Sequence, residues 1–241
     1  LVGYNAITTP DSVAAGFLVR TDLLASGRWK TPKDFEGMNF GIVTPVGGMS
    51  DVYLDRAGQK YGFDYTKINR TFLPFNQMPA AMANKAVDAL YTFQPSVSLI
   101  ESQGSGKMEL TTGQIFAGVP GEIFSMSPSF GQQQPEAAIR VMAAYLRGQR
   151  DVWHAIVKKD ASADDIYKIV ANHTPLKDPA LIAKALTSTQ DPNGHMDTAP
   201  VSFVQDEFVK FGTVKQKIDV SQLFDQSLAD AAVQRIGRVN P

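Results

Sequence analysis

Short apolar runs alternate with helical patterns over the first half of the chain. Each run is bounded by turn residues, which is typical of buried strands. The runs lie at residues 17–19, 40–43, 69–73 and 87–91. Apolar residues at helical spacing follow at residues 50–61, 79–85 and 95–104. This alternation predicts an α/β protein with a largely parallel sheet and crossover helices.

The pattern changes after Gly121. Residues 122–126 form the last strand candidate, and most of the remaining chain has a helical pattern. Pro135 suits a first helical position, and apolar residues recur at helical spacing from there to Ile156. Residues 189–200 are rich in turn residues and predict a loop. The second half is therefore expected to be almost entirely helical.

Composition changes this picture mainly by exclusion. The chain has 241 residues, of which 44% are hydrophobic, so it can form one large domain or two lobes. It has 23 Lys and Arg against 24 Asp and Glu, and the net charge of −1 does not favour nucleic acid or an anionic membrane. Without cysteine, disulfides, thiol nucleophiles and cysteine-bound metals are excluded. No apolar run approaches the roughly 20 residues of a membrane span.

A glycine-rich turn, Gly47-Gly48-Met49-Ser50, joins the strand at 40–43 to the helix at 50–61. Backbone N–H groups at a helix start lack partners within the helix, and we expect several of them to face empty space here. Such a start favours an anion or another polar acceptor. No chemically reactive residue accompanies the turn, so it indicates capture of a small molecule without its conversion.

Topology predicts where such a ligand binds. In open α/β sheets, ligands lie beyond the carboxyl ends of the strands. Three segments follow strands in this way, and we expect Thr8 and Thr9 to face them from the N-terminal part and Glu122 from the last strand. The predicted ligand-binding residues are Thr8, Thr9, Thr44, Gly47, Gly48, Met49, Ser50, Asn76, Gln77, Tyr91, Phe93, Gln94 and Glu122.

Structural alternatives remain open for several of these residues. Ser50 also suits the N-cap of the helix that it begins, and the two roles are compatible. Asn76 and Gln77 are common in turns and caps. The rings of Tyr91 and Phe93 fit either the core or an aromatic wall for an organic ligand. For Glu122 the alternative is a structural contact near the hinge, and we expect Arg20 to pair with an acidic neighbour.

The residues that usually perform catalysis form no catalytic pattern. His154, His173 and His195 lie in three separate segments without the spacing of metal ligands. The pair Asp164-Asp165 is typical of a helix start rather than of a general acid and base. The sequence therefore predicts no catalytic residues, no metal site and no cofactor.

Three motifs in this order resemble a known family. Residues 30–43, KTPKDFEGMNFGIV, are similar to a segment written K-S-x-x-D-L-K-G-K-x-V-A-V, and residues 86–90, AVDAL, to an element G-x-V-D-A. The strand candidate at 123–127 followed by Pro135-Glu136-Ala137 resembles a return segment that ends in P-E. In this order they resemble the type II periplasmic solute-binding proteins, and especially the group that binds sulfonates, taurine, nitrate and thiamine precursors.

The resemblance implies a two-lobe type II fold whose three-layer αβα lobes contain mixed, mainly parallel sheets. Lobe one is expected at residues 1–28 and 123–241, and lobe two at residues 29–122. The crossings between them are then expected near residues 22–30 and 120–127. Family members have further strands before this point, so we expect the N-terminal part of lobe one to be missing from this sequence.

The function implied is that of a substrate-binding protein of an ABC importer. It would capture a small organic solute, anionic or ring-containing, by hinge closure, and present it to a membrane permease. The resemblance also implies a monomer that binds no nucleic acid, located in the periplasm or outside the cell, with a lipid anchor as an option. Two alternatives are an enzyme similar to thiamine-pyrimidine synthase, whose cysteine-rich motif is lacking here, and a ligand-sensing domain of a regulator.

Overall fold

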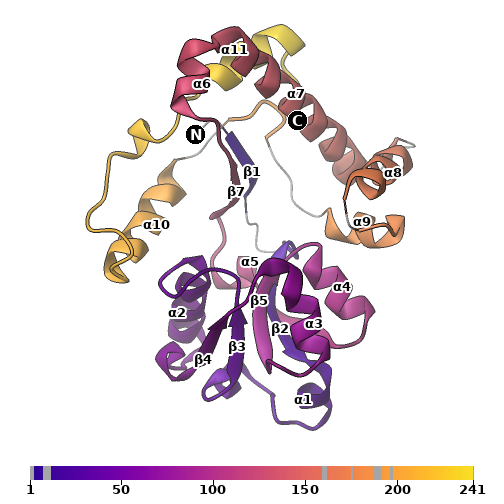
Figure 1. Cartoon of the computed structure of the whole chain (residues 1–241), viewed down its shortest axis with the longest axis vertical. Helices are drawn as coiled ribbons and strands as arrows, with labels where there is room; N and C mark the ends of the chain where they lie inside the picture. Colours follow the sequence, from indigo (N-terminus) through magenta and orange to yellow (C-terminus); the bar gives the residue numbers. More distant parts are fainter. Residues whose placement is uncertain are drawn as a thin grey trace.

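Figure 1 shows the computed structural model of the chain, which describes residues 3–7, 12–158, 162–174, 176–186, 191–195 and 198–240. A sheet flanked by helices forms one end of the molecule, and helices form the other (Figure 1). We call these parts the α/β body (residues 12–119) and the helical half (residues 125–240). A pair of strands runs between them (Figure 1). The predicted site residues Thr8 and Thr9 lie outside the described ranges.

The α/β body is built on a five-stranded sheet with the order β4-β3-β5-β2-β6. β3 runs parallel to β4 and β5, whereas β2 runs antiparallel to β5 and β6. Four strands therefore point one way and β2 points the other way, which confirms the predicted α/β class with a mixed, mainly parallel sheet. The strands are β2 (Ala15–Arg20), β3 (Asn39–Ile42), β4 (Asn69–Phe72), β5 (Ala89–Phe93) and β6 (Gly106–Thr111).

Helices cover both faces of this sheet. Side chains alternate between the faces of a strand, so Phe17 of β2 packs with α2 while the neighbouring Leu18 packs with α3 and α4. Figure 1 shows α2 on one side of the sheet and α3 and α4 on the other. The helices of the body are α1 (Thr21–Ala25), α2 (Met49–Tyr61), α3 (Met78–Ala83), α4 (Ser96–Ser102) and α5 (Thr112–Ile115).

An aromatic cluster forms the core beneath α2. Phe17 is fully buried, and its ring meets those of Phe35, Phe40 and Tyr91 edge to face at centroid distances of 5.9, 5.3 and 5.9 Å. Edge-to-face pairs of this kind add to the stabilisation that burial alone provides. The central strands β2, β3 and β5 each contribute a ring, so the cluster fixes their relative positions.

A two-stranded antiparallel ribbon links the α/β body to the helical half (Figure 1). It consists of β1 (Gly3–Ile7) and β7 (Pro120–Phe124), with Gly3 opposite Phe124 and Ile7 opposite Pro120. β7 lies within the predicted second crossing. The other strand of the connection is β1, which the sequence did not predict as a strand.

The position of β2 corrects the expected domain boundary between residues 28 and 29. Because β2 pairs with β5 on one side and β6 on the other, it is a central strand of the α/β body and cannot belong to the other lobe. The segment 22–30, predicted as a crossing, stays on the same body. There the N–H group of Trp29 donates to the carbonyl of Leu23, and both side chains are buried in the core.

The helical half packs around the long helix α7, whose Met142 and Leu146 are buried against Ala229, Ala232 and Val233 of α11. Among the described helices, none combines the length and the hydropathy that crossing a bilayer requires. The helices are α6 (Pro128–Gln133), α7 (Pro135–Trp153), a π-helical turn (His154–Lys158), α8 (Ala163–His173), α9 (Pro179–Ala185), α10 (Ala199–Lys210) and α11 (Ser227–Ile236).

Candidate ligand-binding site

The directions of the strands bring several predicted site residues to one edge of the sheet. β3, β4 and β5 are parallel, so the segments that follow them, residues 43–50, 73–77 and 94–95, leave the sheet at the same edge. β2 runs the opposite way and begins there. We call this the carboxyl edge. The chain also enters and leaves the α/β body here, so the β1–β7 ribbon lies beyond this edge (Figure 1).

Within the turn after β3, Thr44 and Ser50 are hydrogen-bonded to each other. Their hydroxyl oxygens are 2.8 Å apart, the N–H of Ser50 donates to Thr44 Oγ1 at 3.1 Å, and the N–H of Thr44 donates to Ser50 Oγ at 3.3 Å. Gly48 is the N-cap of α2, so Ser50 is not, and its side chain is fully buried. Ser50 therefore fastens the turn, and Thr44, which is partly exposed, is the hydroxyl of this pair nearer to solvent.

The expectation that several N–H groups of this turn face empty space is wrong. The N–H of Gly47 donates to Asp51 Oδ2 at 2.6 Å, and that of Gly48 donates to the carbonyl of Pro45 at 2.9 Å. Asp51 is 1% exposed, and its Oδ1 lies 2.9 Å from Arg70 Nη1. A carboxylate in the first turn already compensates the helix dipole, so the start of α2 attracts a further anion less than its sequence suggested.

Asp51 and Arg70 were missed because the sequence interpretation stopped at the glycines. An acidic residue three positions after the N-cap is a recognisable signal, since such a side chain can reach back to the N–H groups before the helix. Arg70 belongs to β4, and only the parallel pairing of β3 with β4 brings it to Asp51. That partnership was therefore not visible in the sequence.

An aromatic pair lies at the carboxyl edge. The rings of Phe93, at the end of β5, and Phe75, after β4, are stacked with centroids 4.5 Å apart and an interplanar angle of 12°. Both rings are partly exposed, as expected for a surface that a ring-containing ligand can cover. Phe75 was not among the predicted residues. It follows Pro74 in a strand-to-helix turn. Its place at the same edge of the sheet as Phe93 was the signal that the sequence interpretation missed.

The polar residues beside this pair differ in what they do. Asn76 and Gln77 are exposed, and Gln77 is the N-cap position of α3 without a capping hydrogen bond from its side chain. Gln94 bonds to the protein itself, because its Oε1 accepts from the N–H of Ser98 at 3.1 Å and its Nε2 donates to the carbonyl of Val13 at 3.3 Å. Gln94 thus ties the start of α4 to the segment before β2.

Tyr91 is a core residue. Its side chain is 7% exposed and lies among the aromatic cluster, with its ring centroid 5.3 Å from that of Tyr53. Burial raises the pKa of the Tyr91 hydroxyl well above its usual range. The structural alternative therefore holds for Tyr91, and we leave it out of the site proposed below. Phe93, two residues further along β5, reaches the carboxyl edge instead.

Two further expectations concern Glu122 and Arg20. Glu122 lies in β7 opposite Ala6, and its side chain is outside the described part of the structure. Arg20 pairs with acidic neighbours as expected, with Nε 2.6 Å from Asp22 and Nη1 3.3 Å from Asp88. Within the described ranges, no group of three His, Asp or Glu side chains is arranged to hold a metal ion.

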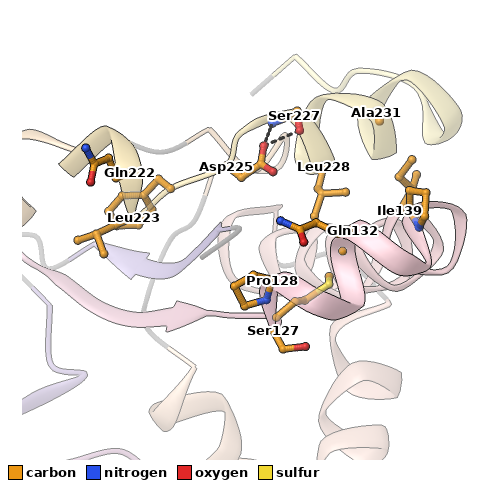
Figure 2. Close-up of a pocket in the computed structure, with 14 residues that line it drawn as sticks. Ser127, Pro128, Gln132, Ile139, Gln222, Leu223, Asp225, Ser227, Leu228 and Ala231 are labelled. Atoms are coloured by element: carbon orange, nitrogen blue, oxygen red, sulfur yellow. Dashed lines mark hydrogen bonds between the residues drawn. The ribbon is translucent and has the colours of Figure 1, made fainter. Parts of the chain in front are cut away.

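A pocket of about 540 Å³ lies elsewhere, in the helical half, between α6, the start of α7 and residues 222–231. Figure 2 shows apolar side chains such as Ile139 and Leu228 along its wall. Its carboxylate, Asp225, accepts hydrogen bonds from the N–H and the hydroxyl of Ser227 (Figure 2). None of the predicted site residues lines this pocket. The carboxyl edge therefore remains the candidate site.

Solved structures share this fold. They include the periplasmic nitrate-binding protein NrtA from Synechocystis PCC 6803, with a TM-score of 0.80, 15% identity, and coverage of 98% of this chain and 67% of that one. The ligand binding component of an ABC-type import system from Staphylococcus aureus gives a TM-score of 0.74 at 11% identity, over 96% and 73% of the two chains. The periplasmic aliphatic sulphonate binding protein SsuA from Escherichia coli gives 0.67 at 20% identity, over 95% and 74%.

The fold is thus the one seen in periplasmic binding proteins, which confirms the resemblance predicted from the sequence motifs. The sequence profile of the NMT1-like family matches residues 3–171, more than half of the chain, and the chain belongs to that family. No curated protein sequence matches it.

Proposed function

We propose that this protein is the substrate-binding component of an ABC-type importer and captures a small organic solute by closure of two lobes. The observation that carries this proposal is the position of the β1–β7 ribbon. It is the antiparallel connection between the α/β body and the helical half, and it lies beyond the edge where the candidate residues gather. Small rotations within such a connection close two lobes over a ligand.

The α/β body and the β1–β7 ribbon would supply different parts of the site. From the α/β body we assign the turn at 44–50, with the Thr44 hydroxyl foremost, and residues 75–77 and 93–94. Thr8 and Thr9, which precede the α/β body in the sequence, and Glu122 of β7 would supply further contacts. The stacked Phe75 and Phe93 rings support a ligand with a ring or another flat apolar part. The N–H of Gly47 already donates its hydrogen bond to Asp51 and is not free to bind an anion. We therefore propose a ring-containing solute rather than a small inorganic anion.

The remaining parts of the proposal follow from the function. The protein would act as a monomer in the periplasm or outside the cell and deliver its solute to a membrane permease, with or without a lipid anchor. Its role is binding and presentation, without chemical conversion of the solute. The fold shared with the sulphonate and nitrate binding proteins supports this role.

Isothermal titration calorimetry tests the proposal with an alkanesulfonate, nitrate, benzoate and a hydroxymethylpyrimidine as probes. We expect at least one organic probe to bind at a single site and to be recovered unchanged. The Phe93→Ala variant should bind it more weakly. Val141→Ala serves as the control, because Val141 is 42% exposed on α7, outside the α/β body that carries the carboxyl edge. Conversion of a probe to product, or equal weakening by both substitutions, would overturn the proposal.

A further inference from the structure

A helix from the C-terminal part of the chain lies against the helix that begins at the glycine turn. α10 contacts α2 through charged pairs, with Arg56 Nη2 2.6 Å from Glu207 Oε1 and Lys210 Nζ bonded to Asp55. Asp55 and Glu207 are 8% and 6% exposed. The two carboxylates are shielded from water, whereas the side chains of Arg56 and Lys210 are 28% and 50% exposed, so each pair lies at the rim of the contact between the helices.

Two neighbouring aromatic rings beside Arg56 reinforce this contact. The guanidinium carbon of Arg56 lies 4.3 Å from the ring centroid of Phe203 on α10 and 5.4 Å from that of Phe116, which follows α5. The two rings are themselves 4.6 Å apart. Cation–π contacts favour this stacked placement of a guanidinium. α10 is therefore joined to both α2 and the end of α5.

The segment just after α10 reaches the glycine turn directly. The hydroxyl of Thr213 donates to the carbonyl of Gly47 at 2.6 Å. Gly47 has a φ of +87°, and a Cβ built on it would lie 2.8 Å from this hydroxyl oxygen. The N–H of Gly47 is held by Asp51, so both backbone polar groups of Gly47 have fixed partners, one from α2 and one from the C-terminal segment.

A second route connects the same two regions. The ring of Phe211 meets that of Tyr65 edge to face at 6.0 Å, and the guanidinium of Arg70 lies 5.4 Å from the Tyr65 ring. Arg70 in turn pairs with Asp51, the residue that accepts from Gly47. Phe211 is thus connected to the turn through the side chains of Tyr65, Arg70 and Asp51. Thr213 is connected to it through the backbone carbonyl of Gly47.

We propose that Thr213 is a positioning residue for the candidate site, and that α10, docked on α2, delivers it there. In this role it sets the orientation of the Gly47–Gly48 peptide and hence the shape of the turn that presents Thr44. The proposal deepens the function given above and rests on it where ligand affinity is concerned. It assigns to the C-terminal segment a part in recognition, although none of its residues was among the predicted ligand contacts.

Hydrogen exchange measured by NMR tests this role without a ligand. Thr213→Val removes the hydroxyl at constant size, and Thr213→Ser keeps it. We expect amide exchange at residues 47–50 to be faster by roughly two- to tenfold in the Val variant, the factor that corresponds to one hydrogen bond. The Ser variant should exchange like the wild type, and the amides of α7 should be unchanged in both. Exchange at residues 47–50 that is the same in all three proteins would overturn the proposal.

A second pair of variants tests the docking of α10. Lys210→Gln removes the bond to Asp55, and we expect faster exchange in α10 and at residues 47–50 together. Lys217→Gln is the matched control, because its partner Asp206 is on an exposed face, 2.7 Å away. If α10 loosens while residues 47–50 keep their wild-type rates, α10 does not deliver Thr213 and the proposal fails in that part.

Calorimetry with the probes named above separates this proposal from the function on which it rests. Weaker binding by Thr213→Val, with affinity restored in Thr213→Ser, supports both. Wild-type affinity in the Val variant, together with wild-type exchange, overturns the positioning role and leaves the function standing. If the variants change the exchange rates but the wild type binds none of the probes, the positioning role of Thr213 stands and the proposed function is overturned.

Discussion

Asp22 lies between two cations where β2 passes into α1. Its carboxylate is 2.6 Å from Arg20 Nε and 3.1 Å from Lys85 Nζ. The hydrogen bond from Arg20, followed by that from Lys85, lowers the pKa of Asp22 to about 2. Because this pKa is below the unfolded value of 3.8, the ionised carboxylate stabilises the folded state above pH 3.8. That stabilisation is lost as the pH falls from there to about 2.

The Asp22→Asn substitution should therefore destabilise the protein at pH 7 and have little effect near pH 2. The loss at pH 7 should be below about 1 kcal/mol, since the carboxylate is 43% exposed and water screens the pairs. Urea denaturation at several pH values measures the difference in the free energy of unfolding between the two proteins. A difference that stays constant from pH 7 to pH 2 would contradict this account.

Arg150 fixes the C-terminal tail to α7. Its guanidinium donates to the carbonyls of Pro192 at 2.8 Å and Gly237 at 2.7 Å, and also reaches the side chain of Asn193. Arg150→Met leaves these partly buried acceptors without their donor, and we expect a loss of about 1.5–3 kcal/mol in the free energy of unfolding. Arg150→Lys should restore only part of it, because an ammonium group cannot span the same acceptors. A Lys variant as stable as the wild type would refute this.

At the scale of elements, β2 and β6 approach each other closely at Gly16. A Cβ on this residue would lie 2.3 Å from the carbonyl oxygen of Leu110 and 2.6 Å from Met108 Sδ. Gly16→Ala must therefore push the two strands apart, at a cost of about 1–3 kcal/mol. Gly131→Ala in α6 is the control, since a Cβ there meets nothing within 4 Å. Thermal unfolding should show a lower midpoint for the first variant only.

The strands buried on both faces were predicted well, and so was the edge strand β4, which was expected at residues 69–73 and lies at Asn69–Phe72. β2, β3 and β5 are apolar runs because helices cover both sides of the central sheet. β6 was missed. It is an edge strand that carries exposed Lys107, and its mixed composition lacks the continuous apolar run that was sought. The placement of β2 was also missed, because pairing between strands far apart in the sequence leaves no local pattern.

The candidate site was predictable to a similar extent. Topology alone indicated which segments meet at the carboxyl edge, because parallel strands end on the same side. The hydrogen bond from Gly47 to Asp51 had a local sequence signal that was missed, whereas the one from Thr213 could not be foreseen, because Thr213 arrives from more than 160 residues away. The residues near a ligand are thus easier to predict from sequence than the groups that hold them in place.

At the scale of the whole molecule, the proposed function requires the α/β body to move relative to α7 and α8. The chain has no cysteine, so two can be introduced for fluorescent labels without background. Lys107 in β6 and Lys168 in α8 are suitable, because their side chains are 66% and 67% exposed. We expect energy transfer between them to change when a probe binds, as closure moves the labels relative to each other. A pair at Lys67 and Lys107, within the body, should show no change.

No change in either pair at saturating probe would mean that binding occurs without closure. A change in both pairs would instead point to rearrangement within the sheet. These outcomes are distinguishable because the α/β body has its own core and its five strands pair only with one another.

The pairing of β1 with β7 also has a consequence for the order in which the molecule forms on the ribosome. Ile7 is opposite Pro120, so the ribbon joins residues separated by more than a hundred positions, while all five strands of the sheet lie between them. A chain synthesised from its N-terminus can therefore complete the sheet first. β1 must wait until β7 emerges, and the folded sheet shortens the path over which it has to find its partner.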